Sequence, residues 1–204
     1  MIADYFNLRS VNKKRELEKL NQKIRNCKKC NLWRRRKNVV PGEGPANAKM
    51  FFVAEAPGRM ESIQGKPFVG PAGKFLDKLF DLSGIDRKNV FITGTLKCRP
   101  VIGNRNRKPE PKEIKACLPY LKKQIEIINP KRFILLGEVA FSIFFSKDAK
   151  RPKEKLKDFR GKWITLQQTQ GRKGFFITYH PAAGLRFPKI KKILEKDFGK
   201  MKIQ

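Results

Sequence analysis

Histidine and acidic residues are scarce in this sequence. One histidine, His180, and 18 aspartates and glutamates stand against 48 lysines and arginines, so the formal net charge is +30 over 204 residues. Such an excess of one sign opposes folding through self-repulsion and is typical of proteins whose partner is a polyanion. The basic residues are spread along the chain and form no separate tail. The composition therefore favours nucleic acid over a membrane surface as the partner.

Long apolar runs are also missing. The segment 1–20 lacks the apolar core of a signal peptide, and no run approaches the length of a membrane span. We therefore expect no membrane partner and a cytoplasmic location, associated with the nucleoid if the partner is DNA. The hydrophobic fraction of 40% is nevertheless sufficient for a packed core, and the length predicts a single domain over residues 1–204.

Cysteine is limited to four residues. In a reducing compartment these are expected to be metal ligands or core residues rather than disulfides. Cys27 and Cys30 form a C-x2-C pair, a spacing that brings two thiolates onto one metal, whereas Cys98 and Cys117 lie in distant segments. Four cysteines match an all-cysteine site that holds either a [4Fe–4S] cluster or zinc. The alternative is four unconnected structural cysteines.

Short apolar segments alternate with helical patterns along the chain. The expected strands are 51–53, 90–96, 132–136 and 175–178, and the expected helices are 10–26, a segment that begins near residue 71, 112–128, 138–145 and 189–201. Strands that alternate with helices indicate a mostly parallel sheet with helices on both faces. The sequence thus predicts an α/β fold with three layers, α/β/α, around a central four-stranded, mostly parallel sheet.

Polar and aromatic residues follow two of the expected strands. Glu55 and Glu61 come just after the strand 51–53, Phe68 follows within the same connection, and His180 comes just after the last strand, behind Tyr179. Open α/β sheets place their sites at the carboxyl ends of strands, so we expect these residues to share one site. The alternative is an ordinary connection with solvated carboxylates, a core phenylalanine and a histidine satisfied within the core.

Several motifs occur in a fixed order along the chain. They are Cys27-x-x-Cys30, VVPGEG at 39–44, EAPG at 55–58, QGKPFVGPAGK at 64–74, KCRP at 97–100, Cys117 and YHPAA at 179–183. From about Cys27 to the C-terminal helix, the sequence resembles the iron–sulfur, or family 4, uracil-DNA glycosylases. The order and spacing of the motifs together are far more specific than any one of them.

The resemblance implies a four-stranded parallel sheet with the active site at the strand ends. It also implies a structural [4Fe–4S] cluster held by Cys27, Cys30, Cys98 and Cys117. By the same resemblance, Phe68 stacks on the flipped base, while Glu55 and Glu61 position or polarise the hydrolytic water. His180 stabilises the negative charge that develops on the departing base.

The resemblance further implies damaged DNA, double- or single-stranded, as the partner of a monomeric enzyme. Arg105 and Arg107 lie in the basic loop 103–111, which either contacts nucleic acid or is simply a long solvated loop. Leu185 follows the YHPAA motif and is expected either to wedge into the gap left by the extruded base or to pack against the protein. Arg186 is expected to contact DNA beside it.

Three positions depart from the family pattern. Gly94 stands where the family has an asparagine whose amide reads the uracil edge, Ala54 replaces a glycine before EAPG, and Ser62 replaces an acid after Glu61. A site that loses a hydrogen-bonding reader loses discrimination. With Ala54, Phe68 and Gly94 lining the base, we expect the fold and the glycosylase class to be retained. Hypoxanthine or xanthine is expected to be accepted besides uracil.

Two function classes therefore follow from the sequence. The first is a hydrolase, a monofunctional DNA glycosylase of base excision repair that leaves an abasic site. The second is a non-catalytic iron–sulfur or zinc protein that binds DNA and recognises lesions without cutting. Release of a base from lesion-bearing DNA separates the two classes, and the visible absorption of an iron–sulfur cluster separates iron from colourless zinc.

Overall fold

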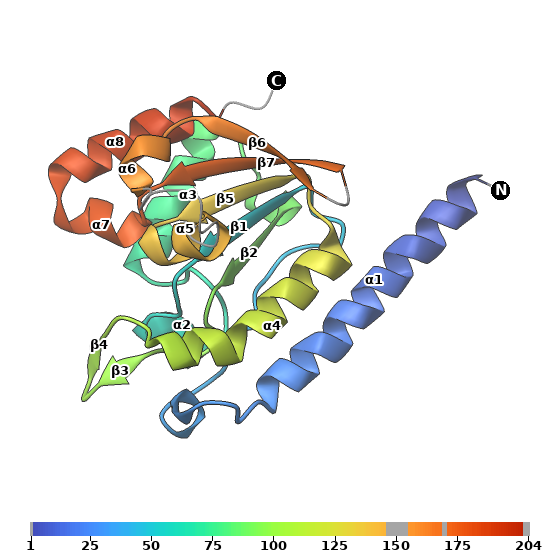
Figure 1. Ribbon diagram of the computed structural model, residues 1–204, viewed down its shortest axis with the longest axis horizontal. Coiled ribbons are helices and arrows are strands. Elements are labelled where there is room, and N and C mark those ends of the chain that lie inside the picture. Colours follow the sequence, from blue (N-terminus) through green and yellow to red (C-terminus); the bar gives the residue numbers. More distant parts are fainter. Residues whose placement is uncertain (1, 146–154, 169–170, 202–204) are drawn as a thin grey trace.

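A computed structural model describes residues 2–145, 155–168 and 171–201 of the chain. The main sheet contains β1 (Met50–Ala54), β2 (Val90–Gly94), β5 (Arg132–Leu136), β6 (Trp163–Gln168) and β7 (Gly171–Thr178) in the order β2-β1-β5-β7-β6. β1, β2, β5 and β7 are parallel to one another. The α/β fold and its mostly parallel sheet are thus confirmed (Figure 1).

The sheet has five strands in the described residues, not the four expected. The additional strand, β6, lies at the edge and pairs antiparallel with β7. The side chains of residues 163–167 are exposed or only half-buried, so β6 carries no apolar run of the kind that marks the central strands. β6 was not predicted because an edge strand needs to bury little apolar surface and so shows no apolar run in the sequence. Its partner β7 begins at Gly171, four residues before the predicted strand 175–178.

Helices cover both faces of the sheet. They are α1 (Ile2–Arg25), α2 (Arg59–Gln64), α3 (Pro71–Ser83), α4 (Pro111–Ile128), α5 (Glu138–Phe145), α6 (Leu156–Phe159), α7 (Pro181–Arg186) and α8 (Pro188–Gly199). Two 3₁₀ turns, Asn31–Arg34 and Arg87–Asn89, and a small hairpin of β3 (Val101–Ile102) and β4 (Arg105–Asn106) complete the described chain. α3, α7 and α8 pack together, and α1 packs along α4 (Figure 1).

The central strand β1 shows why the sequence forms three layers. All five of its residues are buried, as expected for a strand covered on both faces. Phe51 and Val53 point into the core beneath α4 and α5, while Phe52 and Ala54 point into the core beneath α3 and α8. This alternation follows from the two-residue period of a strand, and it divides the apolar side chains into two cores.

A buried carboxylate fixes the end of β7. Asp197, on α8, is fully buried and accepts hydrogen bonds from the Thr178 hydroxyl at 2.7 Å and from the Arg160 guanidinium at 2.6 Å. Gly161 lies against the same carboxylate with φ +74°, and a Cβ at this position would stand 2.5 Å from Asp197 Oδ1. Asp197 therefore holds in place the strand end that precedes His180.

We expect Gly161→Ala to destabilise the protein more than Gly84→Ala. Both glycines have a left-handed backbone, but a Cβ at Gly84 (φ +68°) meets nothing within 4 Å. The left-handed backbone alone costs an alanine about 1–2 kcal/mol. Displacing the buried Asp197 carboxylate from its partners adds at least about 2 kcal/mol. Chemical denaturation of both variants measures the difference, and equal losses would contradict the packing described.

Candidate functional site

The candidate site lies where the parallel strands end. The parallel strands run in the spatial order β2-β1-β5-β7, so the chain passes from β1 to β2 on one side and then crosses from β2 to β5 on the other side of β1. In open α/β sheets, ligands bind outside the carboxyl ends of the strands at such a switch point. Ala54 and Gly94 are paired at the ends of β1 and β2, and Glu55 follows Ala54. Figure 1 shows α2, α7 and the β3–β4 hairpin along this side of the molecule.

His180 and Phe68 come together at this edge. Their rings are stacked with centroids 5.6 Å apart and planes 22° from parallel. His180 lies two residues after the end of β7, and Gly137, which follows β5, lies so close to it that a Cβ there would be 3.1 Å from the His180 Cβ. The structure thus brings together the imidazole and the aromatic ring that the sequence placed in separate segments.

The imidazole of His180 is a neutral hydrogen-bond donor. His180 is the N-cap of α7, and its Nδ1 accepts a hydrogen bond from the Ala182 amide at 3.1 Å. Burial lowers the pKa of His180 to about 4. Because the ring is neutral at physiological pH and Nδ1 is an acceptor, its proton lies on Nε2. A neutral N–H donor suits the stabilisation of a developing negative charge.

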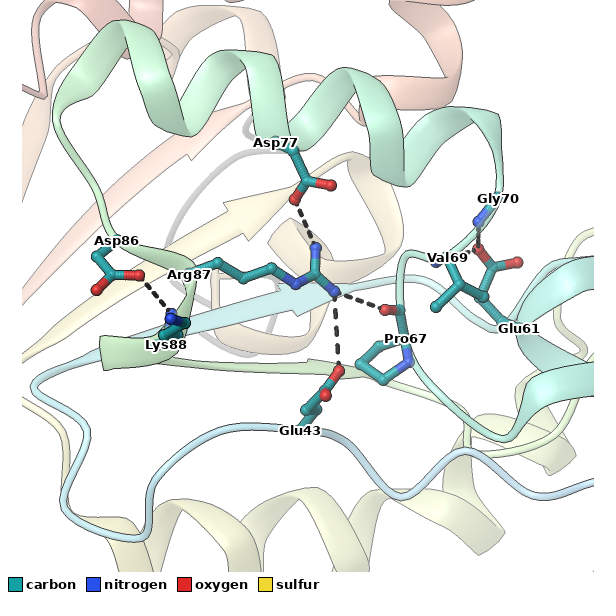
Figure 2. Close-up of polar contacts among 9 residues, drawn as sticks. All are labelled: Glu43, Glu61, Pro67, Val69, Gly70, Asp77, Asp86, Arg87 and Lys88. Carbon is teal, nitrogen blue, oxygen red and sulfur yellow. Dashed lines mark hydrogen bonds and ion pairs between the residues drawn. The ribbon is translucent and has the colours of Figure 1, made fainter.

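Phe68 has an unusual backbone. Its φ is +53°, a left-handed value that is rare for a bulky side chain. Such strain persists only where the surrounding structure imposes it, and it gathers at functional sites. Two side chains hold the flanking residues (Figure 2). Glu61 Oε1 accepts hydrogen bonds from the amides of Val69 at 3.0 Å and Gly70 at 2.8 Å.

Arg87 secures the other side of the Phe68 loop. Its guanidinium donates to the Pro67 carbonyl at 2.8 Å and to Asp77 at 2.8 Å, and it lies 3.9 Å from the Glu43 carboxylate (Figure 2). These three partners belong to the Phe68 loop, to α3 and to the turn before β1, so one side chain ties three segments together. Arg87 was not predicted from the sequence, because a bond to a distant main-chain carbonyl leaves no local pattern.

The two predicted carboxylates differ in what they contact. Glu61 is bound to the backbone of the Phe68 loop, whereas no described residue donates a hydrogen bond to the Glu55 carboxylate. Burial raises the pKa of Glu55, and the nearby charge of Lys108 opposes this rise. Of the two carboxylates, Glu61 is therefore the one that the structure ties to the backbone beside Phe68.

We expect Gly73→Ala to displace the Phe68 loop. A Cβ at Gly73, in the first turn of α3, would lie 1.9 Å from the Phe68 carbonyl oxygen. Gly199, in α8, has nothing within 4 Å of its Cβ position, so Gly199→Ala is the matched control. Amide hydrogen exchange at Val69 and Gly70 should accelerate by at least about tenfold in Gly73→Ala, because loss of their bonds to Glu61 lowers the local opening energy. Unchanged exchange at both amides would contradict this close packing.

The four cysteines line one cavity. Cys27 and Cys30 flank the turn after α1, Cys98 follows β2, and Cys117 lies in α4. N–H groups point at three of the sulfurs: those of Lys29 to Cys27 at 3.5 Å, of Lys97 to Cys117 at 3.3 Å and of the Arg36 guanidinium to Cys98 at 3.5 Å. Hydrogen bonds to sulfur of this kind accompany cysteine-ligated metal centres.

The arrangement and the protonation of the thiols determine what this cavity can bind. Among the described residues, no three His, Cys, Asp or Glu side chains are arranged to hold one metal ion. Burial raises the pKa of the Cys98 thiol and raises that of Cys117 to about 11, so a bound metal would have to displace these protons. The structure thus places four thiols around one cavity, with N–H donors directed at three of the sulfurs.

The predicted DNA-contacting residues have different surroundings. Arg105 is exposed on the β3–β4 hairpin, and Leu185 (52% exposed) and Arg186 are exposed on α7. The Arg107 guanidinium is bound to the Glu113 carboxylate, which caps α4, so this side chain braces the hairpin. Phe187, 56% exposed beside Leu185 and Arg186, was not predicted; its apolar character in a basic segment was the available signal.

A groove of about 940 Å³ adjoins α7. It is lined by side chains of α3, α7 and α8. The lining residues include the basic Lys74, Lys78, Arg186 and Lys191, the apolar Leu82 and Leu185, and the acidic Asp81 and Glu195. The predominance of cations suits a phosphate backbone.

The fold and the site define a doubly wound α/β protein with polar and aromatic residues at its strand ends and a separate four-cysteine site. A family model for the uracil DNA glycosylase superfamily matches residues 41–199. The Type-4 uracil-DNA glycosylase of Saccharolobus solfataricus is 47% identical over 187 residues, which cover 91% of this chain and 85% of that protein. That of Thermotoga maritima is 39% identical over 188 residues, covering 91% and 93%.

The chain therefore belongs to the uracil DNA glycosylase superfamily and, within it, to the Type-4 uracil-DNA glycosylase family. This confirms the resemblance found in the motifs. None of the described helices is long and apolar enough to cross a membrane.

Proposed function

We propose that this protein is a DNA glycosylase of base excision repair. It extrudes a deaminated base, uracil in the first place, and hydrolyses its N-glycosidic bond to leave an abasic site. The observation that carries the proposal is the stacking of a neutral His180 imidazole on the Phe68 ring at the carboxyl ends of the sheet, the edge at which Glu55 also follows β1. Family membership agrees with it.

The three side chains supply what the reaction needs. A base inside a duplex must be flipped out, at a cost of a few kcal/mol of lost stacking. Stacking on Phe68 returns about 1–3 kcal/mol. Cleavage of the bond between the sugar C1′ and the base passes through an oxocarbenium-like sugar and sends the bonding electrons to the base. His180 Nε2–H donates to a base oxygen as the negative charge develops there.

Glu55 completes the hydrolysis. Its carboxylate orients a water molecule whose oxygen bonds to C1′, and it accepts the proton that this water releases. Glu61 assists through Val69 and Gly70, which keep the Phe68 ring in place for the extruded base. No lysine is required as a covalent nucleophile, so the enzyme is monofunctional.

DNA lies against the side of the molecule that carries α7 and the β3–β4 hairpin (Figure 1). Arg105 and Arg186 contact the phosphate backbone, and Leu185 enters the space left by the base. Arg107 acts indirectly by bracing the hairpin on α4. The protein functions as a monomer in the cytoplasm, at the nucleoid.

The four-cysteine cavity holds a [4Fe–4S] cluster in this proposal. Cys27, Cys30, Cys98 and Cys117 supply its ligands, and the N–H groups directed at three of the sulfurs support thiolates. Such a cluster is structural: it joins the segment after α1, the segment after β2 and α4. The hydrolytic step uses only the chain's own side chains.

Base preference depends on the end of β2. Gly94 has no side chain that could form a hydrogen bond with the base edge, and its neighbour on β1 is Ala54. Main-chain groups must therefore form the hydrogen bonds that distinguish one base from another. A Cβ at Gly94 would be 2.7 Å from the Leu96 carbonyl oxygen, so the main chain folds tightly at this point. We propose that this arrangement accepts hypoxanthine or xanthine besides uracil. Strong preference for uracil over both purines would count against it.

A single-turnover assay tests the function. Matched duplex and single-stranded oligonucleotides carry uracil, hypoxanthine, xanthine or thymine at one position, and alkaline cleavage reveals abasic sites. We expect cleavage at uracil and none at thymine. Binding to uracil-containing DNA without any base release would overturn the enzyme and support a lesion-binding protein instead.

A further inference from the structure

Lys97 is a lysine without solvent access, in the segment between β2 and Cys98. Its side chain is 1% exposed, and its Nζ lies 2.6 Å from Thr93 Oγ1, 2.8 Å from the Gly94 carbonyl oxygen and 2.7 Å from Gln124 Oε1. An ammonium has three N–H donors, and these three oxygens use all of them. The geometry is that of a protonated, charged side chain.

The three oxygens leave the charge of Lys97 uncompensated. Lysine is almost never fully buried unless an acidic partner neutralises it. No carboxylate of the described residues forms an ion pair with Lys97. Burial lowers the pKa of Lys97 to about 8, and a charge on Cys117, whose sulfur accepts a hydrogen bond from the Lys97 amide at 3.3 Å, opposes this lowering. Once a bound metal has displaced the thiol protons, the four-cysteine cavity would supply the missing negative charge.

On its other side, Lys97 belongs to a buried network at the end of β2. Thr93 Oγ1 donates to the Pro41 carbonyl at 2.8 Å, and Gln124 Nε2 donates to the same oxygen at 2.8 Å. Gly42, with φ +133°, packs so tightly that a Cβ would lie 2.9 Å from Thr93 Oγ1. The network joins the turn before β1, the end of β2 and α4.

We propose that Lys97 is a positioning residue that couples the cysteine site to the base pocket. Thiolate charge holds its ammonium from one side, and the ammonium fixes the Gly94 carbonyl and the end of β2 from the other. The part that concerns the base pocket rests on the proposed function. It follows that loss of the bound metal leaves a buried cation without compensation, so that the residues after β2 loosen.

Three variants separate this coupling from ordinary core packing. Lys97→Met removes the charge and its hydrogen bonds, and Lys97→Gln keeps hydrogen bonding without charge. Lys173→Met is the matched control, because Lys173 is also buried (8% exposed) and donates to Asn129 Oδ1 at 2.6 Å and Pro130 O at 2.9 Å, away from the cysteines. The readouts are iron and zinc content, the rate of metal loss to a chelator, and amide exchange at Thr95 and Leu96.

Those two amides bond to the main chain that follows β1: Thr95 to Ala54 O at 2.8 Å and Leu96 to Glu55 O at 3.0 Å. In both Lys97 variants we expect metal loss and exchange at Thr95 and Leu96 to accelerate by at least about tenfold. Metal removal from the unsubstituted protein should also accelerate amide exchange at Thr95 and Leu96. In the Lys97 variants, metal removal should accelerate exchange at these two amides little further. Lys173→Met should change neither readout.

Normal metal retention and normal exchange in Lys97→Gln would overturn the proposal, as would an equal effect of Lys173→Met. If Lys97→Met does not fold, Lys97→Gln and the metal-depleted parent protein still decide the matter. None of these readouts requires base release, so a failure of the coupling and a failure of the proposed glycosylase function are distinguished by separate measurements.

Discussion

His180→Ala should slow base release in single turnover by about 10²–10³-fold, the usual loss when one donor to a developing anion is removed. DNA affinity should stay within about threefold, because the imidazole acts on the departing base and not on the phosphate backbone. Tyr179→Phe, at the preceding residue, is a suitable control and should retain the rate. A His180→Ala variant with the parent rate would show that the imidazole takes no part in the reaction.

The pH dependence tests the charge state of the same ring. Burial lowers the pKa of His180 to about 4 from a usual value of 6.5, so the folded protein keeps the imidazole neutral throughout the range between these values. The rate should therefore show no step from His180 near pH 6.5, and this ring should reduce the rate only as the pH approaches 4. A rate that disappears above pH 6.5 would mean that the imidazolium is the active form.

Substitution of Cys98 or Cys117 by serine is expected to have the second large effect. Both thiols are buried and line the cavity, and loss of one ligand should release the metal and its contribution to folding, which is several kcal/mol for a structural site. We expect the visible absorption of the purified protein to disappear and the midpoint of thermal unfolding to fall by at least about 10 °C. Ser83→Ala, a buried substitution within α3, is the control for general loss of packing.

Metal analysis of the parent protein completes this test. Iron with inorganic sulfide supports the cluster, whereas zinc in a colourless protein would contradict it. Retention of bound metal in both serine variants would show that the cavity is not the metal site.

Much of the fold could be predicted from local patterns. β1, β2 and β5 are short apolar runs bounded by turns, and the parallel arrangement follows from the helices between them. β6 could not be predicted in this way, because its pairing with β7 stabilises an edge strand that has little apolar surface to bury. The stripe of Leu17, Leu20 and Ile24 identified α1, although this helix begins before the predicted residue 10.

Part of the candidate site could be predicted from the sequence, because some of its residues have chemically informative side chains close to the end of a predicted strand. Phe68 and His180 were singled out in this way, and the structure stacks them. The residues that hold their segments were not predicted, because Arg87 binds a main-chain carbonyl 20 residues away and Asp197 binds a side chain 19 residues away in the sequence. The roles proposed for Glu55 and Glu61 remain predictions, and the structure adds that Glu61 contacts the Phe68 loop.

The most direct measurement is the single-turnover rate of uracil release by Glu55→Gln, together with its DNA affinity. Glutamine keeps the shape of the side chain but cannot accept the proton of the attacking water. The rate should fall by at least about 10²-fold while the dissociation constant for uracil-containing DNA stays within about twofold. Glu126→Gln, on an exposed position of α4, should behave as the parent. If Glu55→Gln releases uracil at the parent rate, the strand-end pocket is not the catalytic centre.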